Sequence, residues 1–114
     1  MSEITTVLLS PGGWEEDADV VAALNARLRE LGPEPPDRWA LRNIATRDHA
    51  WGGTKWPPAL YGGALNHLPF DEFARIAGEL PWSEPELFQL FVMTQEEDRY
   101  RVFTLADLRV WTAG

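Results

Sequence analysis

The sequence predicts a single α+β domain over residues 1–114, either ferredoxin-like (split βαβ) or a related two-layer sandwich. Short apolar segments typical of strands alternate with two longer segments of helical periodicity, in the order β-α-β-β-α-β followed by one more strand. A chain of 114 residues, of which 45% are apolar, is enough for one core rather than two. We therefore expect about four to five mostly antiparallel strands, with two helices on one face of the sheet.

The first half of the chain contains the clearest helix. Residues 4–9 are apolar and β-branched, which predicts a strand that ends in the Gly- and Pro-containing turn at 10–13. Between 14 and 31 a helix is predicted, with acidic residues in its first turns and arginines near its end, as the helix dipole favours. Its apolar face is formed by Val20, Leu24, Leu28 and Leu31. Residues 38–44 alternate in polarity and predict a second strand.

The middle of the chain predicts a strand and a second helix. Residues 60–68 have the composition of a strand that is weakened by two glycines. Residues 70–80 have helical periodicity and begin with acidic side chains. Their buried face is expected to consist of Phe70, Phe73, Ala74, Ala77 and Leu80.

The last third of the chain predicts a β-hairpin. Residues 87–93 are apolar on both faces apart from Gln89, a pattern typical of a central strand. A polar turn separates them from a second strand at 100–105, which would pair with them antiparallel. Residues 106–114 show no clear periodicity, and Trp111 is expected to anchor them to the core.

Composition limits the partners and the chemistry. The chain has no cysteine, which excludes disulfides, thiolate metal ligands and a cysteine nucleophile, and agrees with a reducing, cytoplasmic location. A net charge of −8 disfavours nucleic acid and anionic membranes, because phosphate binding depends on Lys and Arg. The first residues lack the features of a signal peptide, and no segment approaches the ~20 apolar residues of a membrane span. Arginine far outnumbers lysine, which suggests a GC-rich bacterial source.

A first candidate site lies between residues 47 and 67, which are locally basic, aromatic and rich in glycine within an acidic chain. Long irregular segments in compact domains are often functional. Its basic side chains would hold an anionic ligand, and its aromatic rings would form the walls of a pocket. The candidate residues are Arg47, His49, Trp51, Lys55, Trp56, Tyr61 and His67. In the alternative interpretation the tryptophans fold inward and cap the core.

Sequence motifs for catalysis and for cofactors are missing. His49 and His67 are not spaced as metal ligands, and no G-x-S-x-G motif surrounds a serine. The glycine pair at 12–13 lacks the rest of a phosphate-binding motif and is followed by acidic residues that would repel an anion. We therefore predict no catalytic residue, no metal site and no cofactor, and an enzyme is the less favoured interpretation.

A second candidate site is an acidic face for a protein partner. Residues 71–98 are strongly acidic, and the face is assigned to Glu84, Glu86, Glu96, Glu97 and Asp98. Charge of this kind steers the encounter with a basic protein. The alternative is a solvated rim with a charged hairpin tip that protects a sheet edge.

These observations lead to two hypotheses about function. The first is a small acidic interaction protein that binds a basic protein, for example as an inhibitor of the immunity or antitoxin type. The second is a domain or enzyme that binds a small anionic ligand through the segment at 47–67. The first is favoured, with neither nucleic acid nor membrane as partner, and the sequence does not determine the oligomeric state.

Overall fold

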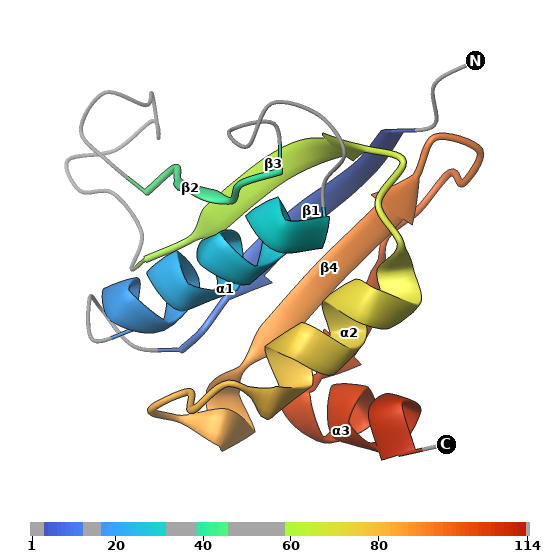
Figure 1. Ribbon diagram of the computed structural model, residues 1–114. Helices are drawn as coiled ribbons and strands as arrows, with labels where there is room; N and C mark the ends of the chain where they lie inside the picture. Colours follow the sequence, from blue (N-terminus) through green and yellow to red (C-terminus); the bar gives the residue numbers. More distant parts are fainter. Residues whose placement is uncertain (1–3, 13–16, 32–38, 46–58, 114) are drawn as a thin grey trace, which may run out of the picture.

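The computed structural model describes residues 4–12, 17–31, 39–45 and 59–113, which form one five-stranded sheet with helices packed against it (Figure 1). The strands are β1 (Ile4–Ser10), β2 (Arg42–Asn43), β3 (Tyr61–Asn66), β4 (Gln89–Thr94) and β5 (Arg101–Thr104). The helices are α1 (Ala18–Leu31), α2 (Phe70–Glu79) and α3 (Leu105–Ala113), and a short 3-10 turn, η1 (Pro85–Leu87), precedes β4.

The strand order confirms the predicted fold class. The order is β2-β3-β1-β4-β5, and every neighbouring pair is antiparallel. In a split βαβ unit, the two strands joined by a helix leave room for one strand between them. Here α1 joins β1 to β2 with β3 between them, and α2 joins β3 to β4 with β1 between them. The first four strands are therefore arranged as in a ferredoxin-like sheet, and β5 extends it beyond β4.

The positions of most elements agree with the sequence pattern to within two residues. This holds for β1, β3, β4, β5 and α2, and β4 lies inside the sheet as its apolar sequence predicts. The predicted first helix is found from residue 18 to residue 31, and its expected start at 14 lies outside the described residues.

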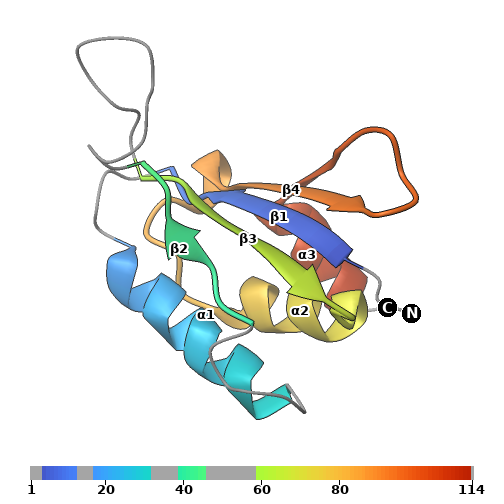
Figure 2. The same cartoon turned by 90° about the horizontal axis from the view of Figure 1, so that it is seen from above.

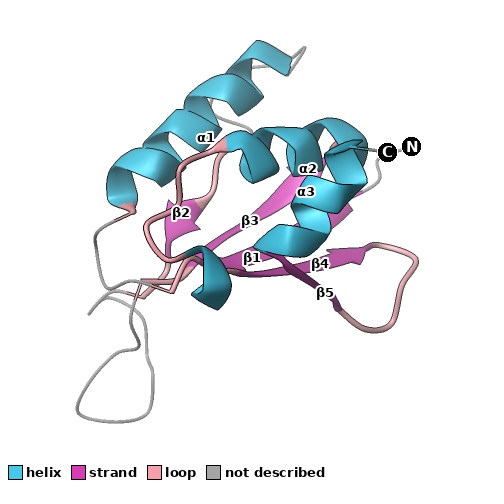
Figure 3. Ribbon diagram, turned by 90° about the horizontal axis from the view of Figure 1, so that it is seen from below, coloured by secondary structure: helices cyan, strands magenta, loops and turns pink. Residues whose placement is uncertain are grey.

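The core lies between the sheet and a single layer of helices. Figure 2 and Figure 3 show α1, α2 and α3 on the same side of the sheet. The sheet face toward them, here named the inner face, is centred on side chains that are at most 1% exposed, namely Val7, Leu9, Leu65, Leu90 and Val92. The helices contribute Leu24, Leu28, Phe73, Ile76, Leu105 and Leu108, which are at most 2% exposed.

Strand β2 is much shorter than the expected strand at 38–44. The side chain of Asn25 on α1 accepts a hydrogen bond from the Leu41 N–H at 2.8 Å and donates one to the Leu41 carbonyl at 3.0 Å. The Asn43 side chain accepts from the Ala45 N–H at 2.9 Å. Since backbone groups that are bonded to side chains do not need a strand ladder, regular pairing with β3 is limited to Arg42 and Asn43, followed by one further bond from the Ile44 N–H to the Leu60 carbonyl at 2.8 Å.

A third helix forms where the sequence pattern led to no assignment. The Thr104 Oγ1 accepts a hydrogen bond from the Asp107 N–H at 3.1 Å, and the Asp107 carboxylate accepts one from the Thr104 N–H at 2.9 Å. This reciprocal pair is a capping box, which satisfies backbone donors at a helix start. The expected number of two helices is therefore too low, and α3 packs against α2 with Leu105 and Leu108 buried.

Candidate functional site

The sheet has a second face, opposite the helices, which we name the outer face. In β1, β3, β4 and β5 its residues alternate with those of the inner face and are paired across the strands by the register. These residues are Ile4, Thr6, Leu8, Ser10, Gly62, Ala64, Asn66, Gln89, Phe91, Met93, Val102 and Thr104. No described helix covers this face, as Figure 2 shows.

An apolar row crosses the centre of the outer face. Leu8 is paired with Gly62 on one side and Phe91 on the other, and Phe91 is paired with Val102 on the edge strand. A Cβ atom on Gly62 would lie 3.1 Å from Leu8 Cδ2 and 3.4 Å from Ile44 Cδ1, so these two side chains flank the space above the glycine. The row therefore runs from Ile44 to Val102, whose side chain is 54% exposed.

Arg42, the partner of Gly62 on the short strand β2, is the ionised side chain that the register places on the outer face of the described strands. The outer-face residues of β1, β3, β4 and β5 include no other. The helical layer is different, because each helix in it carries charged side chains. They are Asp19, Arg27, Arg29, Glu30, Asp71, Glu72, Arg75, Glu79, Asp107 and Arg109. In a chain with 25% charged residues, the two surfaces are therefore chemically distinct.

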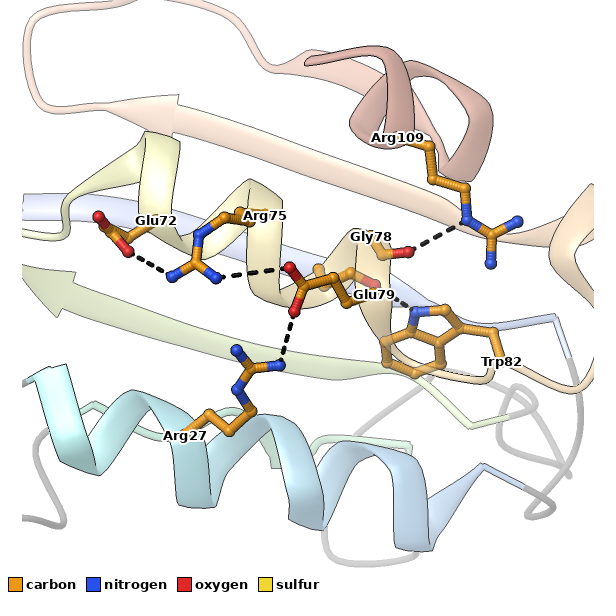
Figure 4. Close-up of polar contacts among 8 residues, drawn as sticks. Arg27, Glu72, Arg75, Gly78, Glu79, Trp82 and Arg109 are labelled. Carbon is orange, nitrogen blue, oxygen red and sulfur yellow. Dashed lines mark hydrogen bonds and ion pairs between the residues drawn. The ribbon is translucent and has the colours of Figure 1, made fainter. Parts of the chain in front are cut away.

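Four of the helical charges form a network of ion pairs within α2 that one pair, Arg27 with Glu79, connects to α1 (Figure 4). Glu79 accepts a hydrogen bond from Arg27 on α1 at 3.0 Å and a longer one from Arg75 at 3.4 Å, while Arg75 also pairs with Glu72 at 2.7 Å. The hydrogen bond from Arg27 lowers the pKa of Glu79, and Glu72 raises the pKa of Arg75. These pairs are exposed to solvent, so they contribute little to stability and are not free to bind a partner.

The predicted acidic face is divided between the two ends of β4. Glu84 and Glu86 belong to the turn that precedes the strand, whereas Glu96, Glu97 and Asp98 follow its last residue. A six-residue strand separates its ends by roughly 20 Å, so the five carboxylates do not form one cluster.

The carboxylates after β4 are partly neutralised by the chain itself. Glu97 accepts a hydrogen bond from the Thr94 N–H at 2.8 Å and pairs with Arg101 at 3.1 Å. Hydrogen bonds from Thr94 lower the pKa of Glu97, and the charge of Arg101 lowers it further. Arg99 lies 3.6 Å from Asp98, with both side chains almost fully exposed. This hairpin tip, residues 95–100, therefore has an internal role in closing the β4–β5 turn.

The start of α1 contacts the segment before β4 that carries Glu84 and Glu86. Asp17 is only 2% exposed, and its carboxylate accepts hydrogen bonds from the Ser83 N–H at 3.0 Å and the Ser83 hydroxyl at 3.1 Å. Asp19, two positions further along the chain, is exposed on α1. We name the pair of Glu84 and Glu86, which the turn itself brings together, the acidic end.

Gly12 lies close against the same segment, as Gly62 does against Leu8. Gly12 has a φ of 95°, and a Cβ atom there would lie 2.5 Å from Leu87 Cβ. A side chain at position 12 would therefore collide with η1 as well as strain the backbone. The sequence predicts a turn at 10–13, but no local signal connects Gly12 to a segment more than 60 residues away.

Most of the predicted ligand site at 47–67 lies outside the described residues, namely Arg47, His49, Trp51, Lys55 and Trp56. Of the other two, Tyr61 is 6% exposed on the inner face beside Leu9, whereas His67 is exposed with a φ of 56°. They stand at opposite ends of β3, so the fold does not bring them together.

Searches with this chain against protein-family models, curated proteins and solved structures found no significant match. Within the described ranges, no group of three acidic or imidazole side chains could hold a metal ion. No described helix is long and apolar enough to cross a membrane. The function is therefore inferred from the residues and their geometry alone.

Proposed function

We propose that this chain is a small, acidic, cytoplasmic interaction protein that binds a basic protein partner at its acidic end. An inhibitor of the immunity or antitoxin type, which neutralises its target by binding it, is the specific form of this proposal. The observation that carries it is the pair Glu84 and Glu86 in the turn before β4, a turn that the bonds between Asp17 and Ser83 tie to the start of α1. In the part of the chain that the structure describes, these two carboxylates form no ion pair.

Electrostatics favours the acidic end over the hairpin tip as the contact for a basic surface. The hairpin tip contains Arg99, and Arg101 follows it directly, so its negative charge is largely offset. The acidic end contains no basic residue. The net charge of −8 makes the electrostatic potential around the whole chain negative at longer range as well. Exposed charges of one sign accelerate association with an oppositely charged partner and improve discrimination against wrong ones.

The side chains of the described residues support binding rather than catalysis. Their buried carboxylate, Asp17, is bonded to Ser83, and many of the others form ion pairs or caps. A general acid or base needs a position within reach of a substrate as well as an adjusted pKa. The hypothesis of an anionic ligand at 47–67 gains no specific support from Tyr61 or His67, which lie apart.

The first experiment is to identify the partner and its dependence on salt. The tagged chain is used to capture proteins from host lysate at low and at high salt, and the bound fraction is analysed by mass spectrometry. We expect one basic protein in stoichiometric amount, bound at low salt and largely lost at high salt, because exposed charges are screened. Binding that is indifferent to salt would contradict the proposal.

Paired variants then locate the contact. Glu84→Gln with Glu86→Gln, and Glu96→Gln with Asp98→Asn, each remove two negative charges and leave the same net charge. With the purified partner, we expect the first pair to slow association several-fold, measured by stopped-flow mixing, and the second to have a smaller effect. Equal effects of the two pairs would mean that only the total charge matters, and the acidic end would lose its assigned role.

A further inference from the structure

Among the tryptophans that lie in the described residues, one differs from the other two. Trp39 and Trp82 are 7% and 4% exposed, and their indole N–H groups donate to backbone carbonyls. Trp111 on α3 is 44% exposed, and its indole N–H donates to the carboxylate of Asp71 at 2.9 Å. Since an aromatic side chain that only fills the core is expected to be buried, as the first two are, the exposure of Trp111 suits contact with another molecule.

The indole ring of Trp111 is held in place by the chain itself. Its centroid lies 5.4 Å from that of Phe70 and 6.0 Å from that of Phe103, and both contacts are edge-to-face. The bond to Asp71, in the first turn of α2, fixes the ring from a second side. A side chain that its own chain has already immobilised loses little conformational entropy when a partner binds. Tryptophan is also among the residue types that contribute most to binding at interfaces.

Asp71 gives this site its charge. Asp71 is exposed, and in the described ranges it forms no ion pair, whereas Glu72 beside it is paired with Arg75. The face of an indole ring carries a partial negative charge and attracts cations. The ring face and the neighbouring carboxylate together favour a positively charged ligand over an anion.

The adjacent contact of Arg101 shows how the chain itself holds a cation. The guanidinium carbon of Arg101 lies 5.6 Å from the ring centroid of Phe70 and 5.8 Å from that of Phe103. The same guanidinium pairs with the carboxylate of Glu97 at 3.1 Å, which offsets its positive charge. Trp111 with Asp71 offers the same combination of aromatic ring and carboxylate, and no described cation lies over its ring.

We propose that Trp111 and Asp71 form a binding site for an arginine side chain of a protein partner. The planar guanidinium would stack on the exposed part of the indole ring and pair with the adjacent carboxylate, a combination that suits arginine better than lysine. The net charge of −8 attracts a partner that is rich in such side chains. The site lies on α2 and α3 and uses no residue of the acidic end, so it does not depend on the proposed function.

The test uses the full chain labelled with nitrogen-15 and a small cationic probe, N-acetyl-arginine amide. Each tryptophan gives its own indole N–H signal in a proton–nitrogen correlation spectrum, and Trp111→Phe identifies the signal of Trp111 by its loss. The probe is added from about 1 mM to about 200 mM at constant ionic strength, a range that brackets a dissociation constant on the order of 10 mM, as expected for exposed cation–π contacts and ion pairs. We expect a saturable shift of the Trp111 signal, with those of the buried Trp39 and Trp82 unchanged.

Matched variants test the role of the carboxylate. Asp71→Asn keeps an oxygen that can accept the indole bond but removes the charge, and it should weaken binding of the probe by about two- to fivefold. Asp19→Asn removes the same charge from the first turn of α1 and should leave the affinity unchanged. The neutral probe N-acetyl-norleucine amide should cause no saturable shift, and N-acetyl-lysine amide should bind more weakly than the arginine probe.

A Trp111 signal that stays in place up to the highest concentration of the arginine probe would overturn the proposal. So would an equal shift with the neutral probe, equal binding of the lysine probe, or an equal loss of affinity in Asp71→Asn and Asp19→Asn. Glu84→Gln with Glu86→Gln should leave this titration unchanged. The result therefore stands or fails separately from the binding of a partner at the acidic end.

Discussion

The two faces of the sheet are built from the same strands yet differ in what covers them. On the inner face, Val92 and Leu90 are fully buried under the helices. On the outer face, the intervening Phe91 and Met93 are partly exposed, and no described helix lies over them. Both sets are apolar. The alternation of side chains along a strand therefore shows which residues share a face, whereas the environment of that face depends on the rest of the molecule.

The same comparison explains why β4 resembles a fully buried strand. An apolar sequence on both faces usually indicates cover on both sides, as in parallel sheets between helices. Strand β4 is central in the order of strands, as predicted, but helices cover only one of its faces.

The largest expected effect comes from truncating the same residue type on each face. Val92→Ala removes two methyl groups from a fully buried site and should lower the free energy of unfolding by about 2 kcal/mol. Val102→Ala should change it by no more than about 0.5 kcal/mol. Urea unfolding of both variants measures the difference. Similar losses at the two positions would mean that the outer face is buried within one chain.

A smaller effect is expected at the start of α1, where the buried Asp17 and the exposed Asp19 lie two positions apart in the chain. Asp17→Ala leaves the Ser83 N–H without its partner and should cost about 1–2 kcal/mol of unfolding free energy. Asp19→Ala removes the same charge from the start of α1 but should cost no more than about 0.5 kcal/mol. Thermal or urea unfolding of both variants tests the difference. Equal stability of the two variants would mean that the bonds from Ser83 to Asp17 do not stabilise the contact between α1 and the turn before β4.

The smallest expected effect is a change in the acid dependence of stability at the hairpin tip. The pKa of Glu97 is lowered in the folded chain, so its carboxylate stabilises the fold above the ordinary Glu pKa of about 4.3. That contribution is lost as the pH falls through the folded-state pKa. Glu97→Gln should therefore be less stable than the original chain at pH 7, and the difference should shrink toward about pH 3. Glu96→Gln, which removes a neighbouring exposed carboxylate, is the control in urea unfolding at both values of pH.

Local patterns were sufficient to predict most of the fold. The apolar residues of α1 and α2 recur at helical spacing, and the strands are short apolar segments between turn residues, so each element could be located from nearby residues. The start of α3 also has a local signal, because Thr104 and Asp107 have the spacing of a capping box, although Asp is less common there than Glu or Gln. The length of β2 had no such signal, since it depends on the contact of Asn25 with Leu41.

The candidate sites required contacts between distant parts of the chain. The acidic residues of the predicted partner face are divided between the two ends of β4, a division that follows from the strand that separates them. The turn that carries Glu84 and Glu86 is tied to the start of α1 because Asp17 bonds to Ser83, 66 residues away. The outer face could not be recognised without the register, because Leu8, Phe91 and Val102 come from three strands.

The sequence by itself determined the fold class, the net charge, the absence of thiol chemistry and the position of most helices and strands. These properties depend on composition or on periodicity over a few residues, where steric preference and apolar spacing act locally. Only the tertiary structure decided which apolar face the helices cover, which carboxylates stand together and which are paired with arginine. Those outcomes depend on the strand order, and the strand order is set by packing between segments that are far apart in the chain.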